Sequence, residues 1–392
     1  MDENVVEEVV ENTEKKENIK EDTTKKKSNK SIILYLIFTV ILCGVCSFAS
    51  VKIALNSDEK KVVVYQGVNN ETVVNSNSND LTEVVSHISK TVVEVYTESV
   101  SYNSFYGEYV TEGAGSGVII TSDGYIITNN HVIEGASSIK VTLSTGETYE
   151  ADLIGTDYVS DIAVIKIAVD NLPSAVFGDS DKLQVAQNCI AIGNPLGTLG
   201  GTVTTGIISA LSREITIDGQ KMTLLQTDTS INPGNSGGGL FNYSGELIGI
   251  VNAKSSGNNI EGIGFAIPIN YVKEIAKQLI ENGYVQGRGQ LGIVAVNIDS
   301  IQMAWNYGVN NYGIYVKEVT GENAKKAGLV EGDLIVAVNG TETLSLEQLR
   351  AQINQHSAGD EVNLTIIRNK EKIAINITLE QKKDKSIKLA NM

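Results

Sequence analysis

Hydrophobic positions change their spacing several times along the chain, and each change predicts a different kind of structure. Residues 1–30 are almost wholly charged and polar, which is typical of a disordered tail. Residues 31–54 contain an apolar stretch of about 20 uncharged residues, enough to cross a hydrocarbon core of roughly 30 Å as one helix. Residues 55–79 are polar without a helical period, so we expect a linker there.

The apolar stretch has three interpretations: a transmembrane helix, a cleaved signal peptide or a buried core helix. Its length favours a transmembrane helix, and Ser47-Phe48-Ala49 offers no clear small-residue cleavage site. The lysines from Lys25 to Lys30 precede it directly and place the N-terminus in the cytoplasm. We therefore expect one membrane-spanning helix, with everything after residue 55 outside the cytoplasm.

Short β-branched runs separated by Gly, Asp and Ser turns fill most of residues 80–268 and predict strands. A short helix precedes these strands, and Asp80 and Glu83 form a capping-box-like pair at its start. The runs fall into two groups of six, 92–96, 116–121, 125–128, 139–143, 148–156 and 163–167, then 186–192, 202–211, 222–227, 239–243, 247–253 and 262–268. We predict a mainly β protein with two six-stranded antiparallel barrels in one domain, residues 80–283.

A second domain is predicted after a helix over residues 269–282, which Gly283 ends. Residues 284–289 form a short linker at the boundary. Residues 285–380 then predict a compact mixed domain, with helices near 324–327 and 346–355 and strands over 333–338, 361–368 and 370–379. Residues 381–392 are expected to be a frayed tail.

Composition excludes several classes of function. The chain has 47 acidic against 31 basic residues, a net charge of −16, which argues against a nucleic-acid partner. Cys43, Cys46 and Cys189 cannot form a disulfide framework, because two of them lie in the apolar stretch. His87, His131 and His356 are isolated from one another and from cysteine, so we expect no metal site and no cofactor.

A glycine-rich segment around Ser236 is the first candidate for chemistry. Gly234 precedes this serine and Gly237, Gly238 and Gly239 follow it, so the backbone can turn sharply and a carbonyl carbon can approach without meeting a Cβ. Unpaired N–H groups in such a turn can face a developing oxyanion. A simple surface turn is the alternative interpretation.

His131 and Asp161 are candidates to complete a nucleophilic site. A serine hydroxyl is a poor nucleophile until an imidazole takes its proton, and a carboxylate must hold that imidazole in the right tautomer. His131 is the one histidine within the barrel segments and follows a polar turn that ends a strand. Asp161 directly precedes an apolar strand, where an acid is costly without a partner. A structural histidine and a turn-capping aspartate are the alternatives.

Three motifs together resemble the HtrA (DegP-like) family of serine proteases, in the chymotrypsin-type order His, Asp, Ser. They are Thr128-Asn129-Asn130-His131-Val132, Ser160-Asp161-Ile162-Ala163-Val164 and Asn232-Pro233-Gly234-Asn235-Ser236-Gly237-Gly238. The resemblance implies His131 as base, Asp161 as its orienter and Ser236 as nucleophile. It places the oxyanion hole at Gly234, Asn235 and Ser236, with the N–H groups of Gly234 and Ser236 as donors, and a regulatory loop at residues 98–113.

The second domain resembles a PDZ domain. Leu291-Gly292-Ile293, just after Arg288, matches the loop that binds a peptide C-terminus, which adds as a strand beside the following strand. The resemblance therefore implies a peptide-binding role for Arg288, Leu291, Gly292 and Ile293.

Substrate specificity is predicted from positions that chymotrypsin-like enzymes use for the S1 pocket. Ser230, six residues before the nucleophile, corresponds to the pocket base, and Ile250, Val251 and Asn252 correspond to its wall. None is charged, so we expect cleavage after small or medium aliphatic residues rather than after Lys or Arg.

The apolar segment and the resemblance together predict a membrane-tethered serine endopeptidase, and the single anchor and the lack of cysteines for disulfides suggest a bacterial cell surface. The resemblance implies that the enzyme degrades misfolded or damaged extracytoplasmic proteins. It implies a homotrimer and a PDZ domain that binds exposed C-termini. Two alternatives remain open: a site-specific signalling protease acting on a membrane partner, and a non-catalytic chaperone or binding protein with the same fold.

Overall fold

The structure is a computed structural model that describes residues 81–103, 107–193, 201–217, 220–232, 234–253 and 262–383. The predicted tail over 1–30, the membrane helix over 31–54, the linker over 55–79 and most of the tail over 381–392 lie outside these residues. Within them, no helix combines the length and the hydropathy needed to cross a bilayer.

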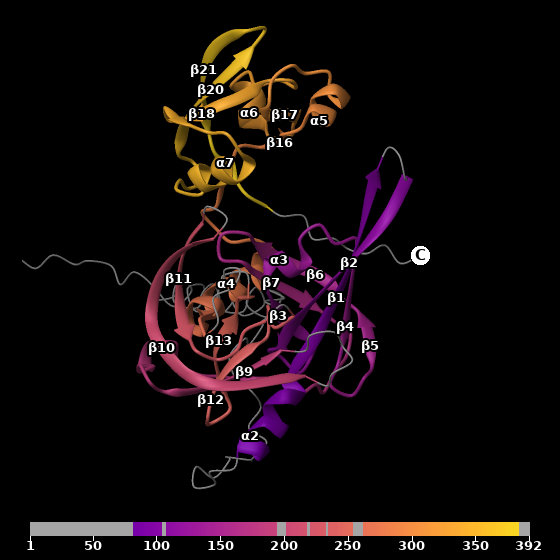
Figure 1. Cartoon of the computed structure of the whole chain (residues 1–392), viewed down its shortest axis with the longest axis vertical. Helices are drawn as coiled ribbons and strands as arrows, with labels where there is room; N and C mark the ends of the chain where they lie inside the picture. Colours follow the sequence, from indigo (N-terminus) through magenta and orange to yellow (C-terminus); the bar gives the residue numbers. More distant parts are fainter. Residues whose placement is uncertain are drawn as a thin grey trace, which may run out of the picture. The chain divides into compact units, whose positions relative to one another are not determined.

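The first group of predicted strands forms one antiparallel sheet with the order β5-β4-β1-β2-β3-β7-β6 (Figure 1). Its strands are β1 (Val92–Asn103), β2 (Gly107–Ile119), β3 (Tyr125–Thr128), β4 (Ser138–Thr142), β5 (Thr148–Glu150), β6 (Asp152–Asp157) and β7 (Ile162–Lys166). The predicted strand over 148–156 is in fact two, β5 and β6, divided by the buried Ala151. Because β5 pairs with β4 and β6 with β7, this bent segment joins the two edges of the sheet.

Strands β1 and β2 are much longer than predicted. They pair continuously from Val92 opposite Val118 to Asn103 opposite Gly107, so most of the expected loop over 98–113 is a β-hairpin. Val100 and Val110 pair across it and are 55% and 58% exposed. The outer half of this hairpin is therefore held by ladder hydrogen bonds and cross-strand pairs, without a core beneath these valines.

The second group forms a sheet that closes on itself. Its strands are β8 (Val176–Phe177), β9 (Asn188–Gly193), β10 (Thr202–Ile217), β11 (Gln220–Thr227), β12 (Gly239–Asn242), β13 (Glu246–Val251) and β14 (Gly264–Pro268). The order β12-β9-β10-β11-β14-β13 is completed by pairing of β12 with β13, which gives a six-stranded ring. Strand β8 adds to β13 in parallel and was not predicted.

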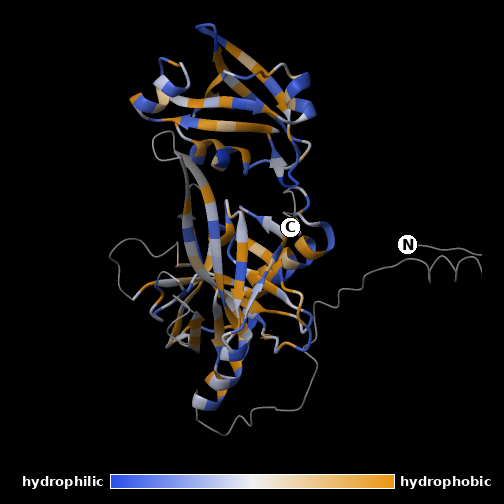
Figure 2. Cartoon of the chain, turned by 90° about the vertical axis from the view of Figure 1, so that its right-hand side faces the viewer, coloured by the Kyte–Doolittle hydropathy of each residue, from blue (hydrophilic) through white to orange (hydrophobic). Residues whose placement is uncertain are grey.

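Hydrophobic side chains form three cores in this domain. One lies within each sheet, and the third lies between them and includes residues from both. Figure 2 shows the corresponding alternation of apolar and polar positions along the strands. The sheets are therefore packed against each other, which fixes residues of one sheet relative to residues of the other.

Helices complete the core between the sheets. Helix α2 (Leu81–Ile88) buries Val84 and Ile88 there, and α4 (Ile269–Asn282) buries one face at the predicted spacing. Helix α4 ends at Gly283, whose φ of 80° only glycine adopts easily and whose N–H donates to the Leu279 carbonyl at 2.9 Å. The predicted helix end is confirmed.

The last part of the chain is a separate small domain with its own core. Its elements are β15 (Gly289–Gln290), β16 (Ile293–Ile298), α5 (Ile301–Asn306), β17 (Gly313–Val319), α6 (Glu322–Lys326), β18 (Leu334–Val338), β19 (Thr341–Glu342), α7 (Leu346–Ile353), β20 (Glu361–Arg368), β21 (Glu371–Thr378) and β22 (Glu380–Gln381). Helix α5 was not predicted, because Ile301 and Trp305 point outward, 79% and 80% exposed, and leave no amphipathic period.

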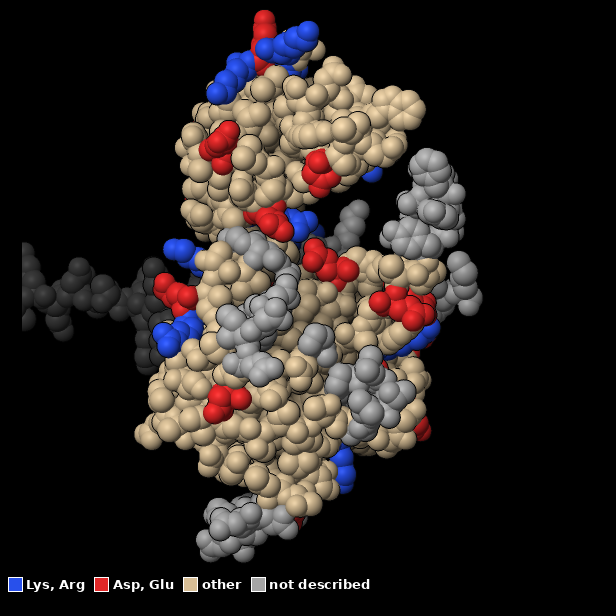
Figure 3. Space-filling model, viewed as in Figure 1, with Lys and Arg blue, Asp and Glu red and all other residues tan. Residues whose placement is uncertain are grey.

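Acidic and basic side chains are interspersed over the face of the molecule in Figure 3. Charges of both signs that lie close together largely cancel at a distance, so this face presents no strong field of one sign.

Candidate active site

His131 lies in the one-turn helix α3 (Asn130–Ile133), directly after β3. Its Nδ1 is 2.7 Å from Oδ2 of Asp161, and its backbone N–H donates to Oδ1 at 3.0 Å. A carboxylate only accepts hydrogen bonds, so we assign the ring proton to Nδ1. The lone pair of Nε2 is then available to take a proton.

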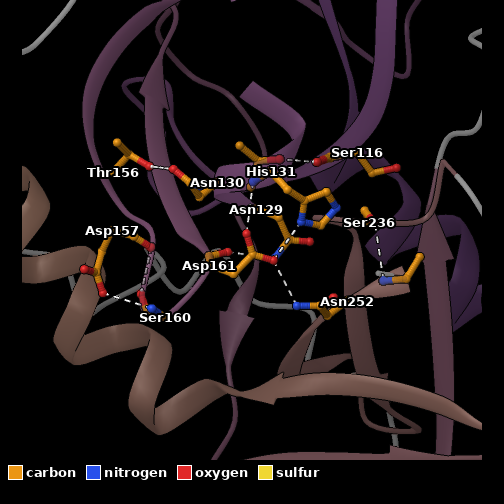
Figure 4. A network of polar contacts seen from close by, with 12 residues as sticks. Ser116, Asn129, Asn130, His131, Thr156, Asp157, Ser160, Asp161, Ser236 and Asn252 are labelled. Atoms are coloured by element: carbon orange, nitrogen blue, oxygen red, sulfur yellow. Dashed lines mark hydrogen bonds and ion pairs between the residues drawn. The ribbon is translucent and has the colours of Figure 1, made fainter. Parts of the chain in front are cut away.

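Asp161 sits before β7 in the left-handed region, with φ of 55°, an uncommon conformation that Asp tolerates better than most residues. Its carbonyl accepts two hydrogen bonds, from the Asn130 N–H at 3.1 Å and the Asn129 side-chain amide at 2.9 Å. Its Oδ2 also accepts from the Asn252 amide at 2.9 Å (Figure 4). The buried acid thus has the partners that its burial requires.

Ser236 follows β11 and precedes β12, so it comes from the second sheet, whereas His131 and Asp161 come from the first. In Figure 4 the His131 ring lies between Asp161 and Ser236. The Ser236 hydroxyl oxygen accepts from the Ala253 N–H at 3.2 Å, and no hydrogen bond joins it to His131 in the part of the chain that the structure describes. Catalytic hydrogen bonds often tighten only with substrate.

The turn before Ser236 leaves two donors available. Among the described residues, no partner accepts from the N–H of Gly234 or of Ser236, whereas the N–H of Gly237 donates to Val251 at 3.0 Å. Two free N–H groups flanking a nucleophile are the arrangement that stabilises an oxyanion. The Asn235 side chain is 1% exposed, and its amide has no partner in the same described set.

Glycine is required at position 237. Its φ is +82°, and a Cβ there would lie 2.2 Å from the Ser116 carbonyl oxygen and 2.4 Å from Oγ1 of Thr128. The turn that contains Ser236, residues 234–238, is called the nucleophile turn below. It packs directly on β2 of the first sheet.

The residues predicted for the S1 pocket differ in exposure: Ser230 is exposed, whereas Ile250, Val251 and Asn252 are buried. Ile250 and Val251 are fully buried in two different hydrophobic cores, and Asn252 is bonded to Asp161. The assignment of these three residues to the pocket wall stays a prediction. Ser230 is exposed and stays a prediction.

The predicted peptide-binding loop directly precedes β16. Strand β16 is at the edge of its sheet and pairs only with β17 among the described strands, and Gly292 has φ of 68°. The guanidinium of Arg288 binds outside this loop. It donates twice to the buried Asp157 of the first domain, at 3.0 and 2.8 Å.

Two site residues were not predicted in their present roles, Asn129 and Asn252, which both bind Asp161. The signal for Asn129 was a pair of asparagines beside the candidate histidine. Asn252 is 91 residues from Asp161, and only the fold brings them together.

The closed second sheet, the partly buried His131–Asp161 pair and the serine turn define a chymotrypsin-like serine protease domain, followed by a PDZ domain. Residues 115–250 match a trypsin-like peptidase domain and residues 289–379 match a PDZ domain. The chain belongs to the HtrA (DegP-like) family of serine proteases, and it is a serine endopeptidase.

Proteins with names of this family are similar to the chain. The chain is 39% identical over 351 residues to the serine protease Do-like HtrB of Bacillus subtilis, covering 82% of this chain and 75% of that one. It is 44% identical over 273 residues to the periplasmic serine endoprotease DegP of Escherichia coli, covering 68% and 57%. A variant of the HtrA-type protease AlgW, solved with a decapeptide, has a TM-score of 0.51 at 32% identity and covers 80% of this chain and 100% of that one.

Proposed function

We propose that this endopeptidase is tethered to the membrane by residues 31–54 and degrades misfolded or damaged proteins outside the cytoplasm. In each turnover the Ser236 hydroxyl gives its proton to Nε2 of His131 and attacks the scissile carbonyl carbon. The N–H groups of Gly234 and Ser236 stabilise the oxyanion. The leaving amine takes the proton, and water releases the acyl group from Ser236 by the reverse sequence.

The observation that carries this proposal is the partly buried contact between Nδ1 of His131 and Asp161 at 2.7 Å, beside a serine turn with two available donors. Asp161 stabilises the imidazolium that forms when His131 takes the proton. The Ser236 hydroxyl accepts from the Ala253 N–H, and a hydroxyl that accepts one hydrogen bond can still donate its own proton to His131.

Hydrolysis of casein by the full chain in detergent micelles tests this mechanism, with Ser236→Ala as its matched control. Loss of the nucleophile should reduce the rate by about 10⁴-fold or more. Equal rates for the two chains, or an inert wild type even with C-terminal peptides added, are incompatible with the proposal.

The quality-control role requires a preference for unfolded chains. We expect reduced, carboxymethylated α-lactalbumin to be cut much faster than the native disulfide-bonded protein, because an extended segment must enter the site. Equal cleavage of both forms contradicts this role. Cleavage after Val or Ala over Arg in a peptide library checks the specificity predicted from Ser230, Ile250, Val251 and Asn252.

The PDZ domain is proposed to capture C-termini of substrates. The edge strand β16 has an open side for an added strand, and the N–H groups of Leu291, Gly292 and Ile293 precede it. Amidation of a substrate peptide's C-terminus removes the carboxylate and should weaken binding at least tenfold. Unchanged affinity would argue for capture elsewhere.

Tethering and assembly are separate proposals. The apolar segment supports the first, and the periplasmic names of the DegP relatives support an extracytoplasmic protease domain. We expect the chain to stay in membranes after carbonate extraction and to be protected from external protease only at its N-terminus. The predicted homotrimer is checked by light scattering of the detergent-solubilised chain.

A further inference from the structure

Ser116 has no assigned role, although it donates two hydrogen bonds to the nucleophile turn from the first sheet. It lies on β2 and is fully buried. Its hydroxyl donates to the Gly234 carbonyl at 2.6 Å, and its backbone N–H donates to the Ser236 carbonyl at 2.8 Å. One residue of the first sheet thus holds the turn on both sides of Asn235.

The hydroxyl bond determines the orientation of one particular peptide group. The Gly234 carbonyl and the Asn235 N–H belong to the same peptide plane. Ser116 binds the carbonyl end, and the Asn232 carbonyl accepts from the N–H end at 3.0 Å. A plane held at both ends cannot rotate without breaking a hydrogen bond.

This plane separates the two proposed oxyanion donors. The Gly234 N–H lies in the preceding peptide group and the Ser236 N–H in the following one. Gly234 has φ of 98° and no Cβ, so sterics alone allow its flanking peptide groups to rotate. We propose that Ser116 is a positioning residue for catalysis: through Gly234, its hydroxyl keeps both oxyanion donors aimed at the same point.

The inference rests on the proposed function, since it assigns these N–H groups to the oxyanion. In Ser116→Ala the Gly234 carbonyl loses its side-chain donor and the plane can rotate. Removing an oxyanion donor outright costs about 10²- to 10³-fold in kcat, so misaiming the donors should cost less. We expect kcat to fall about 10- to 100-fold with KM within about threefold, because substrate binding elsewhere is retained.

A peptidyl trifluoromethyl ketone ending in Val distinguishes positioning from folding. Its carbonyl carbon, labelled with ¹³C, forms a hemiketal with Ser236 whose hydroxyl ionises in the oxyanion hole. Poorer donor alignment stabilises the anion less, so the pKa of the hemiketal should rise by about one unit for each tenfold loss of stabilisation. Ser116→Cys keeps a weak donor of similar size and should fall between wild type and Ser116→Ala.

Thr128→Val is the matched control. Thr128 donates to the Ser116 carbonyl at 2.7 Å, so this variant also loses a buried hydroxyl beside the turn but keeps the bond to Gly234. It should lower thermal stability without shifting the hemiketal pKa. If Ser116→Ala and Ser116→Cys both give the wild-type hemiketal pKa and kcat, the inference is wrong while the protease mechanism stands. An inert wild type overturns the mechanism itself.

Discussion

At the scale of single residues, the site depends on how completely Asp161 is bound. Its carbonyl and both carboxylate oxygens accept hydrogen bonds, and five donors from four residues take part: Asn129, Asn130, His131 through two groups, and Asn252. A buried carboxylate with a positive φ is unfavourable on both counts, and these bonds offset the cost. The residue is therefore held in one position beneath His131.

Asn252→Ala tests the part of this network that comes from the second sheet. Removing the amide leaves Oδ2 of Asp161 with His131 alone, so we expect kcat to fall about tenfold and the free energy of unfolding to fall by about 1–3 kcal/mol. The kcat loss should stay well below the roughly 10⁴-fold effect of replacing a triad aspartate by asparagine. Peptide hydrolysis and urea denaturation measure the two quantities.

Asn242→Ala is the control, because this asparagine also binds a carboxylate, Glu246 at 2.7 Å, at the turn between β12 and β13. Among the described residues its amide makes no hydrogen bond to His131, Asp161 or Ser236. Equal kcat in both variants would show that the Asn252 contact does not support catalysis.

The sequence motifs indicated the residues of the proposed triad but not the residues that support them, for a physical reason. His131, Asp161 and Ser236 each lie in a local motif, and the three motifs together resemble one family. Ser116 and Asn252 lie within ordinary strand patterns, and their partners are 118 and 91 residues away. Only sheet register and the packing of one sheet on the other determine such contacts.

At the scale of elements, the nucleophile turn is fitted to β2 with no spare volume. In Gly237→Ala the new Cβ would overlap the Ser116 carbonyl oxygen at 2.2 Å in addition to the cost of φ at +82°. We expect loss of more than 3 kcal/mol of stability or displacement of Ser236, since the left-handed conformation alone costs about 1–2 kcal/mol. Thermal unfolding and active-site titration measure the two effects.

Gly146→Ala separates the cost of the positive φ from the cost of the steric overlap. Gly146 has φ of +90° in the turn between β4 and β5, and a Cβ there meets nothing within 4 Å. A loss in Gly237→Ala no larger than in this control would mean that the turn can relax away from β2.

The N-terminal end of α4 carries a pH-dependent contact. Asp179, before the short helix η2 (Ser180–Lys182), accepts from the Asn270 amide at 2.7 Å, and this bond together with Lys182 lowers the pKa of Asp179 to about 2. A carboxyl group with a lowered pKa stabilises the fold above its unfolded value of about 3.9, and that contribution is lost as the pH falls towards 2.

Asp179→Asn should therefore lower Tm at pH 6, and the difference from wild type should close between about pH 4 and pH 2. Asp181→Asn, on the same short helix, serves as the control. A Tm difference that stays constant over this range would show that the charge of Asp179 is not what stabilises the contact.

Strand and helix positions were mostly predictable because apolar periodicity reports which side of an element is buried. The errors occur where burial does not determine the structure. The outer half of the β1–β2 hairpin has exposed valines, helix α5 has its large side chains in solvent, and β5 and β6 are divided at Ala151 within one continuous pattern. In each case hydrogen bonds or the geometry of the chain determine the element, and the spacing of apolar residues does not reveal it.

At the scale of the whole molecule, the protease and PDZ domains have separate cores, and two ion pairs join their described residues, Arg288 with Asp157 and Arg350 with Glu134. Arg288 binds Asp157 through two hydrogen bonds, and the side chains are 27% and 3% exposed. Asp157 also accepts from the N–H of Ser160, which immediately precedes Asp161, at 3.1 Å. The contact joins residues 131 positions apart, so no local pattern indicates it.

Arg288→Met tests whether this arginine serves the protease domain or, as its position beside the Leu291-Gly292-Ile293 loop predicts, the peptide. Removing one partner of a fully buried pair costs about 3–5 kcal/mol, and the partial exposure of Arg288 reduces this to about 1–3 kcal/mol. Calorimetry should show the protease transition at lower temperature with the PDZ transition unchanged, and fluorescence anisotropy should show unchanged affinity for a C-terminal peptide.

Asp157→Asn in the same background should add little to the loss of stability, because the two residues act as one pair. Weaker peptide binding with an unshifted protease transition would contradict this prediction. It would show that Arg288 serves the peptide site and that the protease domain does not depend on its contact with Asp157.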